Sequence, residues 1–146
     1  MHYFLQLLAS ALGAVGFALL MQVRRRYIPL IAALSFAAWG VYLLLDQVLN
    51  SFFTMLLAAA FCCLMSEISA RILRCPVTVL LMPSAVSLIP GSDLFYTMYH
   101  AFSGEYGLFR GYGLKTLRSV IAIAAGFAII NLIFRARKSQ TADKQG

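Results

Sequence analysis

Four polar side chains follow a proline-glycine break inside a long apolar stretch, at a spacing that would place them on one helical face. They are Asp93, Tyr96, Thr97 and His100, at i, i+3, i+4 and i+7. A carboxylate, a phenol, a hydroxyl and an imidazole suit the lining of a polar path, and an imidazole can change charge near neutral pH. The candidate residues for a substrate or proton path are therefore Pro90, Gly91, Ser92, Asp93, Tyr96, Thr97 and His100.

The break at Pro90-Gly91 gives these residues their interest. Proline removes a backbone donor and clashes with the preceding turn, and in hydrocarbon the freed backbone is tolerated only inside protein or beside a water-filled cavity. An ionisable residue there, Asp93, is a candidate functional residue. Simpler interpretations stay open. Ser92 or Asp93 can cap a new half-helix, whose N-terminus would also attract an anion, and His100 can lie at the outer interface.

A second polar pair lies earlier in the chain. Glu67 and Arg71 are four residues apart with the acid first, the favourable order for an ion pair on a helix. Inside a membrane such pairing lowers the cost of both charges. We interpret it as an intramembrane ion pair that is either purely structural or, with Ser66 and Ser69 beside it, part of the path.

Several function classes lack their signatures. The sequence has no nucleophile-base-acid pattern, no phosphate-binding glycine loop and no metal-ligand spacing, so we expect neither an enzyme nor a metal or cofactor site. Cys62 and Cys63 lie in an apolar run and fit small packing residues. The formal charge of +7 sits in short clusters between apolar runs, without an aromatic-basic stripe, so we expect no nucleic-acid binding.

The composition indicates a membrane protein. Of 146 residues, 62% are hydrophobic and 12% are charged, whereas a soluble domain carries roughly a quarter charged residues. We predict an all-α polytopic membrane protein with about five transmembrane helices, the fourth broken by Pro-Gly. The segments are residues 3–23, 28–45, 52–73, 77–102 and 117–134, with a polar loop at 103–115 and a polar, disordered tail at 135–146.

Basic residues predict the orientation of this arrangement. Five crossings place nine on one side: Arg24, Arg25, Arg26, Arg71, Arg74, Arg135, Arg137, Lys138 and Lys144. The other side holds Arg110, Lys115 and Arg118. The N-terminus is then outside and the tail cytoplasmic. A re-entrant fourth segment would remove most of this asymmetry, although a partly re-entrant segment stays open.

Small residues predict close helix packing. Ala9 and Gly13 are four apart, as are Ala122 and Gly126, a spacing that lets helix backbones approach in lipid. Packing within this chain and an oligomer interface are both open at this point.

Several short motifs, in order, carry a family resemblance. They are Gly13-Ala-Val-Gly-Phe17, Trp39-Gly40, Glu67-Ile-Ser-Ala-Arg71, Arg74-Cys-Pro76 and Pro83-Ser-Ala-Val-Ser-Leu-Ile-Pro-Gly91, followed by Tyr96. From about residue 13 to 131 the chain resembles the small-subunit half of the threonine/serine exporter (ThrE-type) family, close to the YjjB-like proteins. Each motif alone is weak, but their order and spacing together are fairly specific.

The resemblance implies a function and a partner. Members are secondary exporters of small carboxylate-bearing metabolites, such as threonine, serine or succinate, in the bacterial inner membrane. Split systems pair a short chain like this one with a larger subunit. The chain therefore resembles the small subunit of such an exporter, with lipid, a small carboxylate substrate and a larger subunit as partners, in a homo- or hetero-oligomer. A non-transporting accessory subunit is the alternative.

Overall fold

The computed structural model describes the backbone of residues 2–143 and the side chains of residues 4–134, and this part of the chain contains helices and no strand. Two short 3-10 turns lie in the connections between helices: η1 (Arg25–Tyr27) between the first and second, and η2 (Val86–Leu88) between the fourth and fifth. The helices are α1 (His2–Leu20), α2 (Ile28–Leu45), α3 (Ser51–Leu73), α4 (Val77–Ala85), α5 (Gly91–Phe102) and α6 (Tyr106–Asp143).

The chain is a multi-pass membrane protein, but the predicted count of five crossings is not confirmed. Three helical stretches are long and apolar enough to cross a bilayer, Arg25–Leu45, Ser51–Leu73 and Tyr106–Phe134. The bent pair of α4 and α5 adds a fourth only if it counts as one span. The first apolar helix, Phe4–Leu20, is shorter than these, since about 20 residues are needed to span hydrocarbon perpendicularly.

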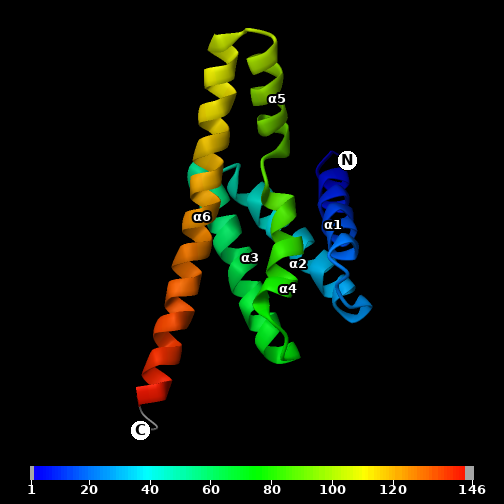
Figure 1. Cartoon of the computed structure of the whole chain (residues 1–146), viewed down its shortest axis with the longest axis vertical. Helices are drawn as coiled ribbons and strands as arrows, with labels where there is room; N and C mark the ends of the chain where they lie inside the picture. The colour runs from blue at the N-terminus through cyan, green and yellow to red at the C-terminus, as the bar shows by residue number, and fades with distance from the viewer. Residues whose placement is uncertain (1, 144–146) are drawn as a thin grey trace.

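Helices α1 to α4 form a compact body, and α6 lies along α3 (Figure 1). Two clusters fill this body. One joins α1, α2, α3 and α4 through side chains that include Ala14, Ile31 and Leu80. The other joins α2, α3 and η2 through small residues such as Ala58 and Cys62. Small side chains let the helix axes approach closely, as is usual where lipid rather than water surrounds the bundle.

The two small-residue pairs have different surroundings. At Gly126 a Cβ atom would lie 2.6 Å from the backbone oxygen of Leu56, and Ala122 is fully buried, so this pair packs α6 against α3 within the chain. At Gly13 a Cβ atom would meet nothing within 4 Å. The spacing therefore marks an intramolecular contact in α6 and an uncovered face in α1.

The predicted break in the fourth segment is present between η2 and α5. Ile89 is extended (φ −65°, ψ 127°), as expected for a residue before proline. The two parts, Val77–Leu88 and Gly91–Phe102, are inclined by 56°. Pro83 does not end α4. Next to it, the Ser84 hydroxyl donates to the Leu80 carbonyl oxygen at 2.8 Å and thereby satisfies its own polar hydrogen inside the apolar segment.

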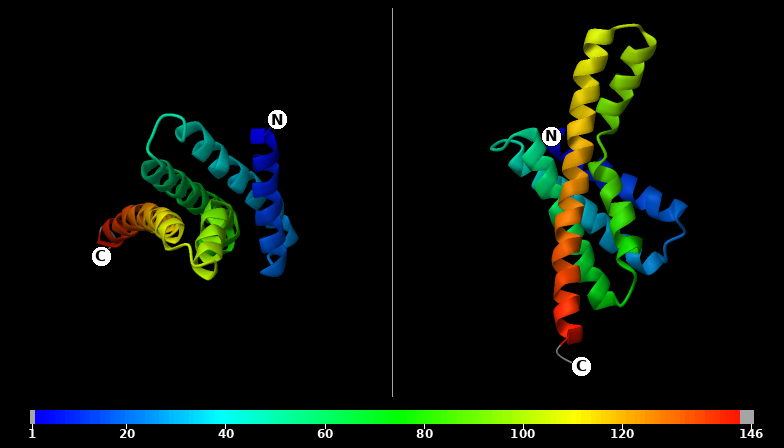
Figure 2. Two further views of the ribbon diagram at one scale, coloured as in Figure 1. Left: turned by 90° about the horizontal axis from the view of Figure 1, so that it is seen from above. Right: turned by 60° about the vertical axis from the view of Figure 1, so that its left-hand side comes forward.

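Helix α5 and the first half of α6 form an antiparallel hairpin that projects beyond the body (Figures 1 and 2). This differs from the predicted polar loop over residues 103–115. Only Ser103, Gly104 and Glu105 separate the two helices, and α6 already begins at Tyr106. Residues 106–115 contain three glycines and two basic residues, which favoured the prediction of a loop. Tertiary contact with α5 stabilises the helix there despite its low intrinsic propensity.

The predicted disorder of the tail at 135–146 is also not observed as far as the backbone is described. Helix α6 continues to Asp143 as one helix of 38 residues. Residues 144–146 lie outside the described residues.

Candidate functional site

The polar face predicted on α5 lies against α6 inside the projecting hairpin. Asp93, Tyr96, Thr97 and His100 each contact a residue of α6 or of the turn before it. Within the described residues the main neighbour of α5 is therefore α6.

Asp93 forms an ion pair across the hairpin. The Lys115 Nζ donates to Asp93 Oδ1 at 3.0 Å, and the Asp93 side chain is only 15% exposed whereas that of Lys115 is 58% exposed. A poorly hydrated carboxylate therefore faces a cation that also reaches solvent. Asp93 lies in the first turn of α5, where the helix dipole also favours its negative charge.

Neither Ser92 nor Asp93 caps this helix. The N-cap residue is Pro90, and no side-chain hydrogen bond is made at the cap. The first turn of α5 thus keeps backbone donors without intrahelical acceptors. The Asp93 carboxylate, one of the two possible caps, forms a contact with another helix instead.

The middle of the hairpin interface is hydroxylic and aromatic. The Thr97 hydroxyl donates to the Asp93 carbonyl oxygen at 2.6 Å and lies 3.4 Å from the Thr116 hydroxyl. The Tyr112 ring stacks on those of Tyr96 and His100, with centroids 5.4 Å apart in both pairs. Stacked rings and hydroxyl groups therefore contribute to the contact between the two helices.

His100 closes the far end of the hairpin. Its Nδ1 lies 2.6 Å from Glu105 Oε2, and because a carboxylate oxygen can only accept, Nδ1 is the donor. The His100 side chain is 12% exposed. The turn between them includes Gly104 with φ +74°, a left-handed conformation that glycine adopts without steric cost. His100 therefore lies at the tip of the hairpin.

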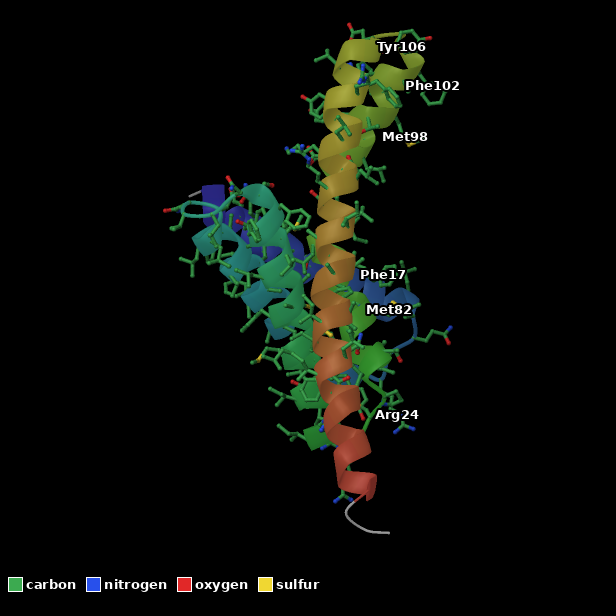
Figure 3. The ribbon with its side chains drawn as sticks, turned by 90° about the vertical axis from the view of Figure 1, so that its left-hand side faces the viewer. Phe17, Arg24, Met82, Met98, Phe102 and Tyr106 are labelled. Atoms are coloured by element: carbon green, nitrogen blue, oxygen red, sulfur yellow. The ribbon has the colours of Figure 1, made fainter. Side chains whose placement is uncertain are left out.

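Several large apolar side chains are exposed on the outer surface of this hairpin. Figure 3 shows Met98, Phe102 and Tyr106 on the projecting part of the chain, away from the body. Their exposed fractions are 55%, 87% and 75%. Large apolar side chains exposed in this number are expected on a segment that contacts lipid or another apolar protein surface.

Glu67 and Arg71 lie apart from this interface, near the opposite end of α3. Arg71 Nε is 3.5 Å from Glu67 Oε2, and the Glu67 side chain is 13% exposed. The Arg71 guanidinium also lies over the Phe134 ring at 4.5 Å. This pair connects α3 to the C-terminal half of α6, so the structure does not bring it together with Asp93.

The residues of α6 that complete the interface were missed by the sequence analysis. They are Tyr112, Lys115 and Thr116. Their spacing, continued at Ser119, is the same i, i+3, i+4, i+7 pattern that identified the face on α5. That pattern was the available signal, but it fell in the stretch assigned to a loop.

Comparison with known proteins gives one family. A family model described as "Threonine/Serine exporter, ThrE" matches residues 6–133, so the predicted membership of the threonine/serine exporter family is confirmed over nearly the whole chain. No curated protein and no solved structure matches the chain.

Proposed function

The chain belongs to the threonine/serine exporter family, whose members are transporters and not enzymes, and on that premise we propose that it is the small subunit of a secondary exporter. The exporter acts on small carboxylate-bearing metabolites, either threonine and serine or a succinate-like acid. The small subunit works with a larger membrane subunit in the bacterial inner membrane.

One observation carries this proposal: the helix break next to the Asp93–Lys115 ion pair. A carboxylate that is 15% exposed and bound to one cation across a helix pair can release that cation when it is neutralised or when another anion competes. Broken helices with free helix ends are where secondary transporters bind substrate and coupling ions. Asp93 is accordingly the coupling or orienting group of the proposed path.

The other predicted path residues act around this pair. Thr97 and Tyr96 hold α5 against α6 next to Asp93, and His100 fixes the tip through Glu105. Glu67 and Arg71 link α3 to α6 far from Asp93, so we assign them a gating contact rather than a contact with substrate.

The proposed orientation has the N-terminus outside and the C-terminus in the cytoplasm. Arg24 and Arg74 line the same pocket, which has a volume of about 390 Å³, and Arg71 lies near them in the sequence, at the end of α3. These cations therefore gather at the end of the body opposite the hairpin, and the positive-inside rule makes that end cytoplasmic.

An accessory role is the competing function, and the apolar outer face of the hairpin favours it. Phe102 is 87% exposed, which suits a surface that binds and stabilises a larger membrane protein. Under this alternative the chain contributes packing and no path residue.

Efflux measurements distinguish the two functions. Cells without their own exporters are loaded with threonine, serine or succinate and express this chain, the larger subunit, or both. We expect efflux only when both chains are present. If the larger subunit alone exports at the full rate with equal membrane abundance, the chain is not a required exporter subunit and the accessory role stands.

A further inference from the structure

An open pocket of about 830 Å³ lies between the start of α3 and the outer half of α6. Its residues come from the α2–α3 connection, the first turn of α3 and one face of α6. They are Asn50, Ser51, Phe52, Phe53, Gly111, Leu114, Lys115, Arg118 and Ser119. The volume lies in the range of small-molecule sites.

The pocket carries two cations and no carboxylate. Lys115 and Arg118 both line it, and none of its residues is Asp or Glu. Among the described side chains Lys115 pairs with Asp93, while Arg118 has no carboxylate within ion-pair distance. Asp93 offsets the charge of Lys115, so the charge of Arg118 is the one left to favour an anion in this cavity until Lys115 is released from Asp93.

The rest of the lining suits a small organic anion. Asn50 and Ser51 contribute polar atoms, and Phe52, Phe53 and Leu114 contribute apolar surface. A guanidinium can bind a carboxylate through two parallel hydrogen bonds, whereas an ammonium acts as a point charge. Arg118 is thus the group suited to hold the carboxylate, with Lys115 as the second contact.

We propose that this pocket binds the carboxylate of the transported metabolite through Arg118 and Lys115, and that Lys115 exchanges Asp93 for this ligand. The choice of a transported carboxylate as ligand rests on the proposed function, whereas the preference for an anion follows from the pocket itself. Lys115 belongs to both sites because its Nζ contacts Asp93 at 3.0 Å and its side chain also lines the pocket. In the absence of ligand, Asp93 competes for the cation that the ligand needs.

The test is direct binding to the full-length chain. The protein is purified in nanodiscs of phosphatidylcholine, alone and with the larger subunit, and binding of radiolabelled succinate and threonine is measured by equilibrium methods. We expect Arg118→Gln to weaken binding about tenfold, because one charge-assisted contact is lost. Arg118→Lys should restore part of it.

A matched control removes the same charge outside the pocket. Arg110 lies on α6, is exposed and is not a pocket residue, so Arg110→Gln should leave binding unchanged. If both substitutions weaken binding equally, only the general positive potential matters and the pocket assignment is overturned. Equal thermal midpoints of the variants establish that each is folded.

The exchange at Lys115 has a test with the opposite sign. Asp93→Asn removes the competing carboxylate, so binding of the anion should become tighter by several-fold, while Lys115→Gln should weaken it. If Asp93→Asn weakens binding to the same extent as Arg118→Gln, Asp93 positions Lys115 for the ligand and the exchange is wrong.

Two further outcomes separate this proposal from others. Nanodiscs that also contain phosphatidylglycerol report on lipid: if succinate and threonine fail to bind in phosphatidylcholine, with or without the larger subunit, the pocket is not a carboxylate site. Direct binding of phosphatidylglycerol that Arg118→Gln weakens would in that case assign it to a lipid phosphate. Saturable binding without cellular efflux would contradict the proposed function but support the anion site in the pocket. Efflux, together with an Arg118→Gln variant that binds the metabolite as tightly as the wild type, would support the proposed function but overturn the anion site.

Discussion

Gly126 of α6 lies directly on the backbone of Leu56 in α3, so close that a Cβ atom at position 126 would be 2.6 Å from the Leu56 carbonyl oxygen and 3.0 Å from the Ala60 nitrogen. Backbone atoms cannot move aside as a flexible side chain can. The contact therefore requires glycine and fixes how closely the two helices approach.

Gly126→Ala should destabilise the protein. The added methyl group must push α6 away from α3, and overpacking of this kind costs about 1–3 kcal/mol. Gly13→Ala is the matched control, since a Cβ there meets nothing within 4 Å and alanine favours the helix by about 0.5–1 kcal/mol. Thermal midpoints in detergent should move in opposite directions. Equal shifts would contradict the contact.

Asp93→Asn should lower export about tenfold while membrane abundance stays normal. The change keeps the size of the side chain but removes the charge of the proposed coupling group, which competes with the ligand for Lys115 and promotes its release; a tenfold change corresponds to about 1.4 kcal/mol. Asp46→Asn is the control, because Asp46 is exposed at the end of α2. Export at the wild-type rate by the Asp93 variant would remove the role assigned to this residue.

Gly104→Ala should loosen the hairpin tip. The residue has φ +74°, and a left-handed backbone costs about 1–2 kcal/mol for residues with a Cβ. Gly104→Asn should be milder, since asparagine tolerates this conformation better. Hydrogen exchange of backbone amides in α5 should accelerate more in the alanine variant than in the asparagine variant. The reverse order would argue against the turn geometry.

Gln22→Gly should stabilise the chain. Gln22 has φ 53° just after α1, where glycine is the usual residue, so the substitution relieves about 1 kcal/mol of backbone strain. Gln47→Gly is the matched control. Gln47 follows α2 and its φ is not positive, so glycine there only adds conformational freedom to the unfolded chain and should lower stability. The thermal midpoints of the two variants are compared with that of the wild type. A lower midpoint for Gln22→Gly would contradict the claim that the backbone is strained at Gln22.

Local chemistry made part of this structure predictable. The break at Pro90 follows from the missing N–H and the restricted residue before it, and both effects act within a few residues. The face of α5 with Asp93 and Thr97 follows from helical spacing alone. In both cases the sequence contains the cause.

Partners were not predictable in the same way. The spacing of Ala9 and Gly13 equals that of Ala122 and Gly126, yet only the second pair is packed against another helix of the chain. Likewise, nothing in the sequence around Asp93 indicates that Lys115 is its partner. The helix that contains Lys115 is stabilised by contact with α5, and this contact is not encoded in local spacing. Small-residue spacing predicts a close approach but not the approaching helix.

Helix α6 is long enough to connect two distant parts of the molecule mechanically. Its 38 residues form one uninterrupted rod about 57 Å long at 1.5 Å per residue, and Gly126 lies near its midpoint, against α3. Lys115 and Arg118 are on one arm, and Phe134, under the Arg71 guanidinium, is on the other. A tilt about this fulcrum would move the pocket and the distant cation–π contact in opposite directions at the same moment.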